Sequence, residues 1–160
     1  MHTLAGEAWF QQDIRKSRFA ARAAPVASID AASAFIARVA VGDATHNCWA
    51  YRVGQHYRFS DDGEPAGTAG RPILQAIDGQ DMDRVAVVVT RWFGGIKLGA
   101  GGLARAYGGT AASCLRAEDR MALVETVQVE IGCDFATLAL IQSRLAGFEA
   151  SAGVPRFDAD

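Results

Sequence analysis

The chain alternates between segments in which the apolar residues have helical spacing and segments in which they have strand-like spacing. Residues 16–24 alternate loosely between apolar and polar positions and stop before a proline, which predicts a first strand. Across 29–39 the apolar residues recur at helical spacing, with Ser28 or Asp30 as a potential N-cap and Gly42 as a potential C-terminal glycine. We therefore expect a strand followed by a helix.

Two strand-like runs come next, at 47–53 and 56–60. They are separated by two residues, of which the first is Gly54, and such a break is typical of a β-hairpin. After an acidic turn, residues 68–77 predict a short helix. Pro72 falls in its first turn, where the missing N–H has no helical partner to lose.

The strongest strand pattern lies at 84–93. Its centre is an unbroken run of alanine and valine, as expected for a strand that is buried on both faces. A glycine-rich loop follows, and residues 102–117 predict a helix with one apolar stripe. The pair Gly108 and Gly109 inside that helix indicates the close approach of another group, for which tight packing of helix on sheet is the favoured explanation.

The last part of the chain starts a new pattern. Residues 124–131 alternate as a strand, and 135–149 predict an amphipathic helix capped by Asp134. One strand and one helix cannot form an independent core. We therefore expect a main domain at 1–118, with residues 119–160 either docked on it or forming a partial second domain that is cut short.

Composition narrows the class of protein. Half of the 160 residues are hydrophobic and 21% are charged, which is typical of a globular protein. The sequence has no apolar run of the roughly 18–20 residues that span a bilayer, and the amino end has no signal-peptide pattern. The three cysteines are far apart and odd in number, which favours reduced, buried thiols in the cytoplasm over disulfides or a zinc site.

The net charge of −2 favours no particular partner, but its distribution is uneven. Residues 84–117 contain five basic residues and no acidic one, whereas 60–83 contain six acidic residues and only Arg71 as a base. Such a cationic block can steer an anionic ligand, and it can equally reflect charge pairing within the protein.

The acidic turn at 60–70 is a first candidate site. Asp61, Asp62 and Glu64 place three carboxylates within four residues, and carboxylates are ligands that Mg²⁺ or Ca²⁺ accept. The spacing fits no EF-hand loop, so solvation or capping of the next helix is the alternative. A third possibility is that Thr68 and the N–H groups after Gly67 form a helix start that accepts an anion.

The glycine-rich segment at 90–109 is a second candidate. A strand, a glycine loop, a helix N-terminus and basic side chains are the components of a phosphate-binding loop, and the segment lacks the Walker sequence and the context of a dinucleotide fold. A purely structural tight turn is the alternative. The candidate anion-binding residues, with one from the neighbouring helix, are Arg91, Gly94, Gly95, Lys97, Gly99, Gly101, Gly102, Arg105 and Arg71.

A third segment, residues 45–51, contains a histidine and a cysteine two positions apart. His46 and Cys48 would share one face of a strand and could act as base and nucleophile. A cysteine between polar and aromatic strand residues is more typical of packing. Trp49, Tyr51, Tyr57 and Trp92 could stack on bases if they are exposed, but strand aromatics are core residues first.

Four segments together resemble the family of bacterial YigZ and eukaryotic IMPACT proteins: KSRF at 16–19, HNCWAYR at 46–52, FSDDGEPAGTAGRPIL at 59–74 and VVTRWFGGIKLGAGGLARAY at 88–107. The resemblance implies an α+β main domain with the order β-α-β-β-α-β-α, similar to the second domain of ribosomal protein S5. It also implies that the last strand and helix begin a ferredoxin-like domain, similar to the last domain of elongation factor G, which is truncated here.

The resemblance further implies a role in translation, because eukaryotic members regulate translation under amino-acid stress. Our first expectation is a non-catalytic, translation-associated protein that binds RNA or the ribosome through the glycine-rich basic loop. A protein-interaction module with a translation-related partner is the second, and an Mg²⁺-dependent enzyme acting on a phosphate-bearing small molecule is the third. Apart from that possible Mg²⁺, no cofactor is expected, and nothing indicates a membrane partner or specificity for DNA.

Overall fold

The structure is a computed structural model that describes residues 1–157. It consists of two units, residues 1–124 and residues 125 onward, and each is described by itself. Within the described residues, no helix is both long enough and apolar enough to cross a membrane.

The first unit is built on a five-stranded antiparallel sheet with the order β2-β3-β6-β4-β5. The central strand β6 is the alanine and valine run, and it is buried on both faces as predicted. A second, two-stranded sheet pairs the first and last strands of the unit. The strands are β1 (His2–Leu4), β2 (Ala8–Ile14), β3 (Ser17–Pro25), β4 (His46–Val53), β5 (His56–Ser60), β6 (Val85–Trp92) and β7 (Arg120–Ala122).

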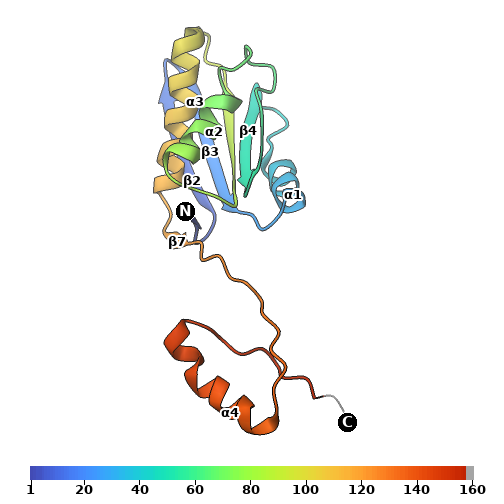
Figure 1. Ribbon diagram of the computed structural model, residues 1–160. Coiled ribbons are helices and arrows are strands. Elements are labelled where there is room, and N and C mark those ends of the chain that lie inside the picture. Colours follow the sequence, from blue (N-terminus) through green and yellow to red (C-terminus); the bar gives the residue numbers. More distant parts are fainter. Residues whose placement is uncertain (158–160) are drawn as a thin grey trace. The chain divides into compact units, whose positions relative to one another are not determined.

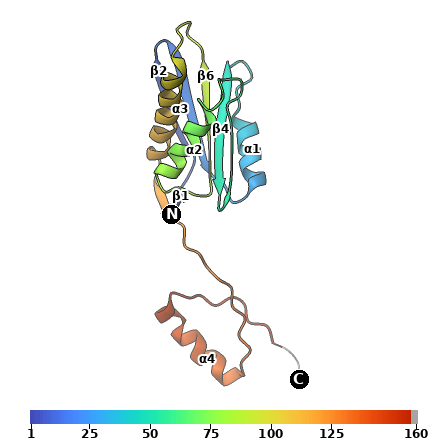
Figure 2. The same ribbon diagram turned by 45° about the horizontal axis from the view of Figure 1, so that its top comes forward.

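Helices cover both faces of the five-stranded sheet (Figures 1 and 2). Helices α2 (Gly70–Gly79) and α3 (Gly99–Arg116) lie side by side on one face, where they bury the larger core with the odd-numbered valines of β6. Helix α1 (Ile29–Val39) packs on the other face, against Ala86 and Val88. Because side chains of a strand alternate between faces, one strand serves both cores.

The order of elements that the resemblance implied is confirmed, because β3-α1-β4-β5-α2-β6-α3 is β-α-β-β-α-β-α. Ser28 is the N-cap of α1, as predicted, but α1 ends at Ala40 in an extended conformation and not at Gly42. Helix α3 begins at Gly99, so three residues that the sequence assigned to the loop belong to its first turn. Strands β1, β2 and β7 were not expected, and β7 brings residues 120–122 into the first unit.

The described part of the second unit, residues 125–157, contains one helix, α4 (Phe135–Arg144), and a short 3-10 turn (Leu145–Phe148). Asp134 caps α4 by accepting a hydrogen bond from the Thr137 N–H, as predicted. The expected strand at 124–131 was wrong: these residues have no regular structure. A strand forms only with a neighbour that completes its ladder, and the described part of this unit offers none.

One turn of the sheet has an unusual backbone conformation and lies closely against a glycine. The hairpin between β2 and β3 turns through Arg15 and Lys16, whose φ angles of 46° and 66° are left-handed. Two such residues form the turn that suits a two-residue hairpin, at a cost of about 1 kcal/mol or more each without glycine. Gly94 lies against this turn so closely that a Cβ there would be 1.8 Å from the Lys16 carbonyl oxygen.

Replacement of Gly94 by alanine should therefore displace the basic turn and destabilise the protein by several kcal/mol, since backbone atoms would have to move. Gly109→Ala is the matched control, because a Cβ at Gly109 meets nothing within 4 Å and alanine favours a helix interior by up to about 1 kcal/mol. Urea unfolding measures both changes. A neutral Gly94→Ala would contradict the close approach.

Candidate functional site

A buried ion pair lies at the centre of the first unit. Arg91 on β6 donates from Nη1 to Oε1 of Glu64 at 2.7 Å, and both side chains are almost completely buried. The Tyr107 hydroxyl, from α3, donates to the same Glu64 oxygen, also at 2.7 Å. A single carboxylate thus joins the acidic turn, the central strand and the third helix.

Three further side chains surround this pair. Ser17 at the start of β3 accepts hydrogen bonds from Nε and Nη2 of Arg91 and from the Gly94 N–H. His46 places Nε2 3.7 Å from the Glu64 carboxylate, and its Nδ1 lies 2.7 Å from the Asp62 carbonyl oxygen. The Cys48 thiol donates to the Asp61 carbonyl oxygen. The four segments that carry the family resemblance therefore meet in one buried network.

The chemistry of this network is that of a structural support. Burial raises the pKa of the Cys48 thiol to about 12, and it also raises the pKa of the Tyr107 hydroxyl, so both groups stay protonated at neutral pH. A thiol is nucleophilic only as the thiolate. The cysteine-nucleophile interpretation of His46 and Cys48 therefore has no support from the geometry, and the packing interpretation of Cys48 holds.

The acidic turn caps the next helix. One Asp61 oxygen accepts from the N–H groups of Ala69 and Gly70, and the other from Gly67. These are the N–H groups that the sequence suggested for an external anion, so Asp61 already fills that role. Asp62 accepts from the Asn47 N–H. With Glu64 bound to Arg91, the three carboxylates do not converge, and the described residues contain no cluster suited to a metal ion.

The glycine-rich segment divides into two parts. Gly94 and Gly95 shape the loop after β6, with Gly95 at φ 92°, whereas Gly99, Gly101 and Gly102 form the first turn of α3. That turn has no side-chain cap, so its N–H groups are not satisfied by a neighbouring side chain.

The predicted basic residues are in different environments. Arg91 is 5% exposed and engaged by Glu64, so it is not available to a phosphate and its assignment as a ligand residue has to be corrected. Lys97 is exposed in the loop, Arg105 is exposed on α3, and Arg71 is exposed in the first turn of α2.

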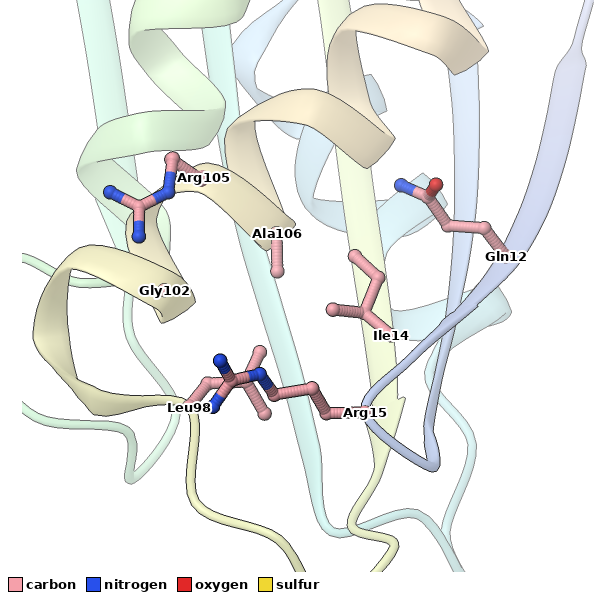
Figure 3. Close-up of a pocket in the computed structure, with 7 residues that line it drawn as sticks. All are labelled: Gln12, Ile14, Arg15, Leu98, Gly102, Arg105 and Ala106. Carbon is pink, nitrogen blue, oxygen red and sulfur yellow. The ribbon is translucent and has the colours of Figure 1, made fainter.

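A cleft of about 390 Å³ lies between the β2–β3 hairpin and the start of α3. Figure 3 shows Arg15 at the hairpin turn and Arg105 on α3, with Ala106 of the same helix facing Ile14 of β2 and Leu98 near Arg15. Gly102 also lines the cleft, whereas Lys97 and Arg71 do not. Gln12 is held in place because its amide donates to the Thr110 hydroxyl at 2.8 Å.

Two of the cleft's polar residues, Gln12 and Arg15, were missed by the sequence reasoning. They lie on β2 and in the turn that follows it. Residues 8–14 alternate regularly between the two faces of the strand, but one face is mostly polar. The signal that could have found them is a two-residue break between alternating runs at 8–14 and 17–24. Arginine and lysine in place of the usual asparagine and glycine concealed that break.

Removal of the buried carboxylate should be strongly destabilising. Glu64→Ala would leave the Arg91 charge buried without its partner, so we expect a loss of about 3–5 kcal/mol in the free energy of unfolding. Glu7→Ala is the control, because it removes an ion pair of the same type, with Arg38, from the surface, where it is worth about 1 kcal/mol or less. Equal losses for the two variants in urea unfolding would contradict a structural network.

Thiol reactivity tests the burial of the network independently. Cys48 and Cys114 are buried, with the pKa of each raised to about 12, whereas Cys133 is exposed. We expect one thiol to react rapidly with a thiol reagent at pH 8 in the native protein and all three to react in urea. Rapid native labelling of Cys48, located by mass spectrometry, would show that the network is open to solvent.

Comparison with known proteins agrees with this architecture. The family model described as the Impact N-terminal domain matches residues 15–115. An IMPACT family member of Thermus thermophilus is 52% identical over 132 residues, which are 82% of this chain and 73% of that protein. The IMPACT family member YigZ of Escherichia coli is 38% identical over 141 residues, covering 84% and 69% of the two chains.

Solved structures also match. The crystal structure of a hypothetical protein has a TM-score of 0.72 and 33% identity, and the match covers 98% of this chain and 80% of that one. A two-domain translational regulator, Yih1, has a TM-score of 0.42 and 29% identity, with 73% and 47% covered. Because the family model spans more than half of the sequence, the chain belongs to the IMPACT family.

Proposed function

We propose that this protein is a non-catalytic, cytoplasmic, translation-associated protein that binds RNA phosphate groups, free or on the ribosome, in the cleft between the β2–β3 hairpin and α3. The observation that carries the proposal is the pair Arg15 and Arg105, two exposed cations at one cleft. Neither takes part in an ion pair among the described residues.

The chemistry of the cleft suits a phosphate group. A guanidinium can bind two phosphate oxygens at once, which a lysine ammonium cannot do with the same geometry. The uncapped first turn of α3 adds N–H groups and the positive end of the helix dipole on the same side. Lys97, next to the cleft, adds a longer-range attraction.

The backbone of the site also suits a fixed binding surface. Arg15 belongs to the strained turn that Gly94 allows to approach, and strained residues persist only where the surrounding structure holds them. The glycine-rich segment would thus act mainly by letting the β2–β3 turn and the loop after β6 lie together. Its contribution to ligand binding would be the N–H groups of Gly101 and Gly102.

A role in translation is supported by the family resemblance, since eukaryotic members regulate translation. The element order β3-α1-β4-β5-α2-β6-α3 likewise supports the proposal that the first unit has the fold of the second domain of ribosomal protein S5. A site that binds RNA backbone without reading bases would suit attachment to ribosomes, because backbone contacts carry no sequence information.

Charge reversal at the cleft tests the proposal. The double variant Arg15→Glu with Arg105→Glu should lose co-sedimentation with ribosomes and total RNA at low salt. The affinity of the wild-type protein for RNA should fall steeply as the salt concentration rises. The logarithm of the binding constant should change with the logarithm of the salt concentration with a slope of about −0.7 for each phosphate contact to a single strand. The control is the double variant Arg58→Glu with Arg116→Glu, which makes the same charge change on β5, at the sheet edge opposite β2, and at the far end of α3.

Equal loss in the control would mean that only net charge matters and that the cleft is not the site. If wild-type protein associates with neither ribosomes nor RNA at any salt, the proposal is wrong and a protein partner becomes the function to pursue. Circular dichroism of each variant shows whether the fold is retained.

A further inference from the structure

The face of the sheet that carries α1 is covered only in part. Helix α1 packs over β6 and β4, and the neighbouring half, formed by β2, β3 and the end of β6, contains an open groove of about 380 Å³. Ala20 and Thr90 form its floor, and the C-terminal end of α1 forms one wall through Val39.

Two tryptophans lie in this groove, each beside an arginine. Trp9 on β2 is paired across the ladder with Arg22 on β3 and is 58% exposed. Trp92 on β6 is paired with Arg18 on the same strand β3, and the Arg18 guanidinium lies 4.2 Å from the centre of the Trp92 ring. The two tryptophans are separated by four residues along the strands and by two strand spacings, which is about 17 Å.

The small residue between the arginines keeps the groove open. Arg18, Ala20 and Arg22 point to the same face because strand side chains alternate. Alanine at the middle position leaves a hollow between two cationic and aromatic walls. Asp13 on β2 is paired with Arg18 across the ladder and is the acidic residue next to this row. Neither Arg18 nor Arg22 forms an ion pair among the described residues.

We propose that this groove binds the unpaired bases of single-stranded RNA, with Trp9 and Trp92 as stacking surfaces and Arg18 and Arg22 as contacts to the backbone. Aromatic rings on an open antiparallel sheet, interleaved with basic residues, are the arrangement that binds single strands through stacking and charge. The two arginines complement a polyanion, which distinguishes this ligand from an apolar peptide or a second copy of the chain.

The inference rests on the proposed function, because both surfaces take RNA. They lie on opposite faces of the same hairpin: Gln12 and Ile14 of β2 face the cleft, and Trp9 and Gln11 face the groove. The cleft would accept the phosphates of any RNA, whereas the groove requires bases that are free to stack. The two sites therefore differ in their response to base pairing.

The test compares a short single-stranded oligouridine with an RNA duplex of the same length, by fluorescence anisotropy of the labelled RNA. Trp9→Ala should weaken oligouridine binding about tenfold and leave duplex binding unchanged. Trp9→Phe should restore part of the lost affinity, since a smaller ring still stacks. Trp49→Phe is the matched control for Trp9→Phe, because Trp49 is partly buried, stacked on Tyr51 and packed against the core under α1.

The outcomes separate the two proposals. If Trp9→Ala binds oligouridine as tightly as wild type while the Arg15 and Arg105 double variant loses both RNAs, the groove inference is overturned and the cleft proposal stands. If Trp9→Ala weakens both RNAs equally, the groove does not distinguish free bases and the inference is also overturned. If wild type binds neither RNA, both proposals fail.

Discussion

The buried ion pair of Glu64 and Arg91 is the constraint on which the first unit depends. Taking two charges out of water costs several kcal/mol each, and only close partners offset this cost. Here the carboxylate receives charge-assisted hydrogen bonds from Arg91 and Tyr107, and the guanidinium also reaches Ser17. No buried side-chain nitrogen or oxygen among the described residues lacks a partner. Loss of either charged partner would leave the other charge buried and unpaired.

The ion pair also fixes the surface on which both proposals rest. Contacts run from Glu64 to Arg91, from Arg91 to Ser17, and from Ser17 to the Gly94 N–H, and Gly94 lies against the carbonyl oxygen of Lys16. The hairpin turn that presents Arg15 is thus held by a chain of contacts that begins at the buried carboxylate. The buried residues of the four segments that carry the family resemblance are therefore explained by architecture. The candidate ligand contacts lie partly within those segments, at Arg18, Trp92 and Arg105, and partly outside them, at Trp9, Arg15 and Arg22.

Elements with strong local patterns could be predicted from the sequence. The β-branched run of β6, the capped periodicity of α1 and the glycine break between β4 and β5 each depend on neighbouring residues only. The roles of Glu64 and Arg91 could not be predicted, because they are 27 positions apart and their pairing is a consequence of the fold. Arg91 lies near the end of a strand and in a basic block, which is also where a ligand residue would be expected.

The other wrong or missed predictions also have identifiable physical causes. The strand expected at 124–131 has the right alternation but no neighbouring strand, and alternation alone cannot supply one. Strand β2 was missed because its turn contains arginine and lysine, and with it Trp9 and Arg15 were missed. Both candidate surfaces depend on this hairpin, so the site was predicted only in the part that α3 contributes.

Replacement of the whole network by apolar groups tests the account most directly. In the triple variant Glu64→Met, Arg91→Met, Tyr107→Phe no buried charge remains, and such replacements are often neutral or stabilising. We predict that this variant, shown to be folded by circular dichroism, binds RNA more weakly than wild type, because Ser17 loses the guanidinium through which the buried pair holds the hairpin turn. A folded triple variant that binds RNA with wild-type affinity would contradict the account, because the turn that presents Arg15 would then be held without the buried pair.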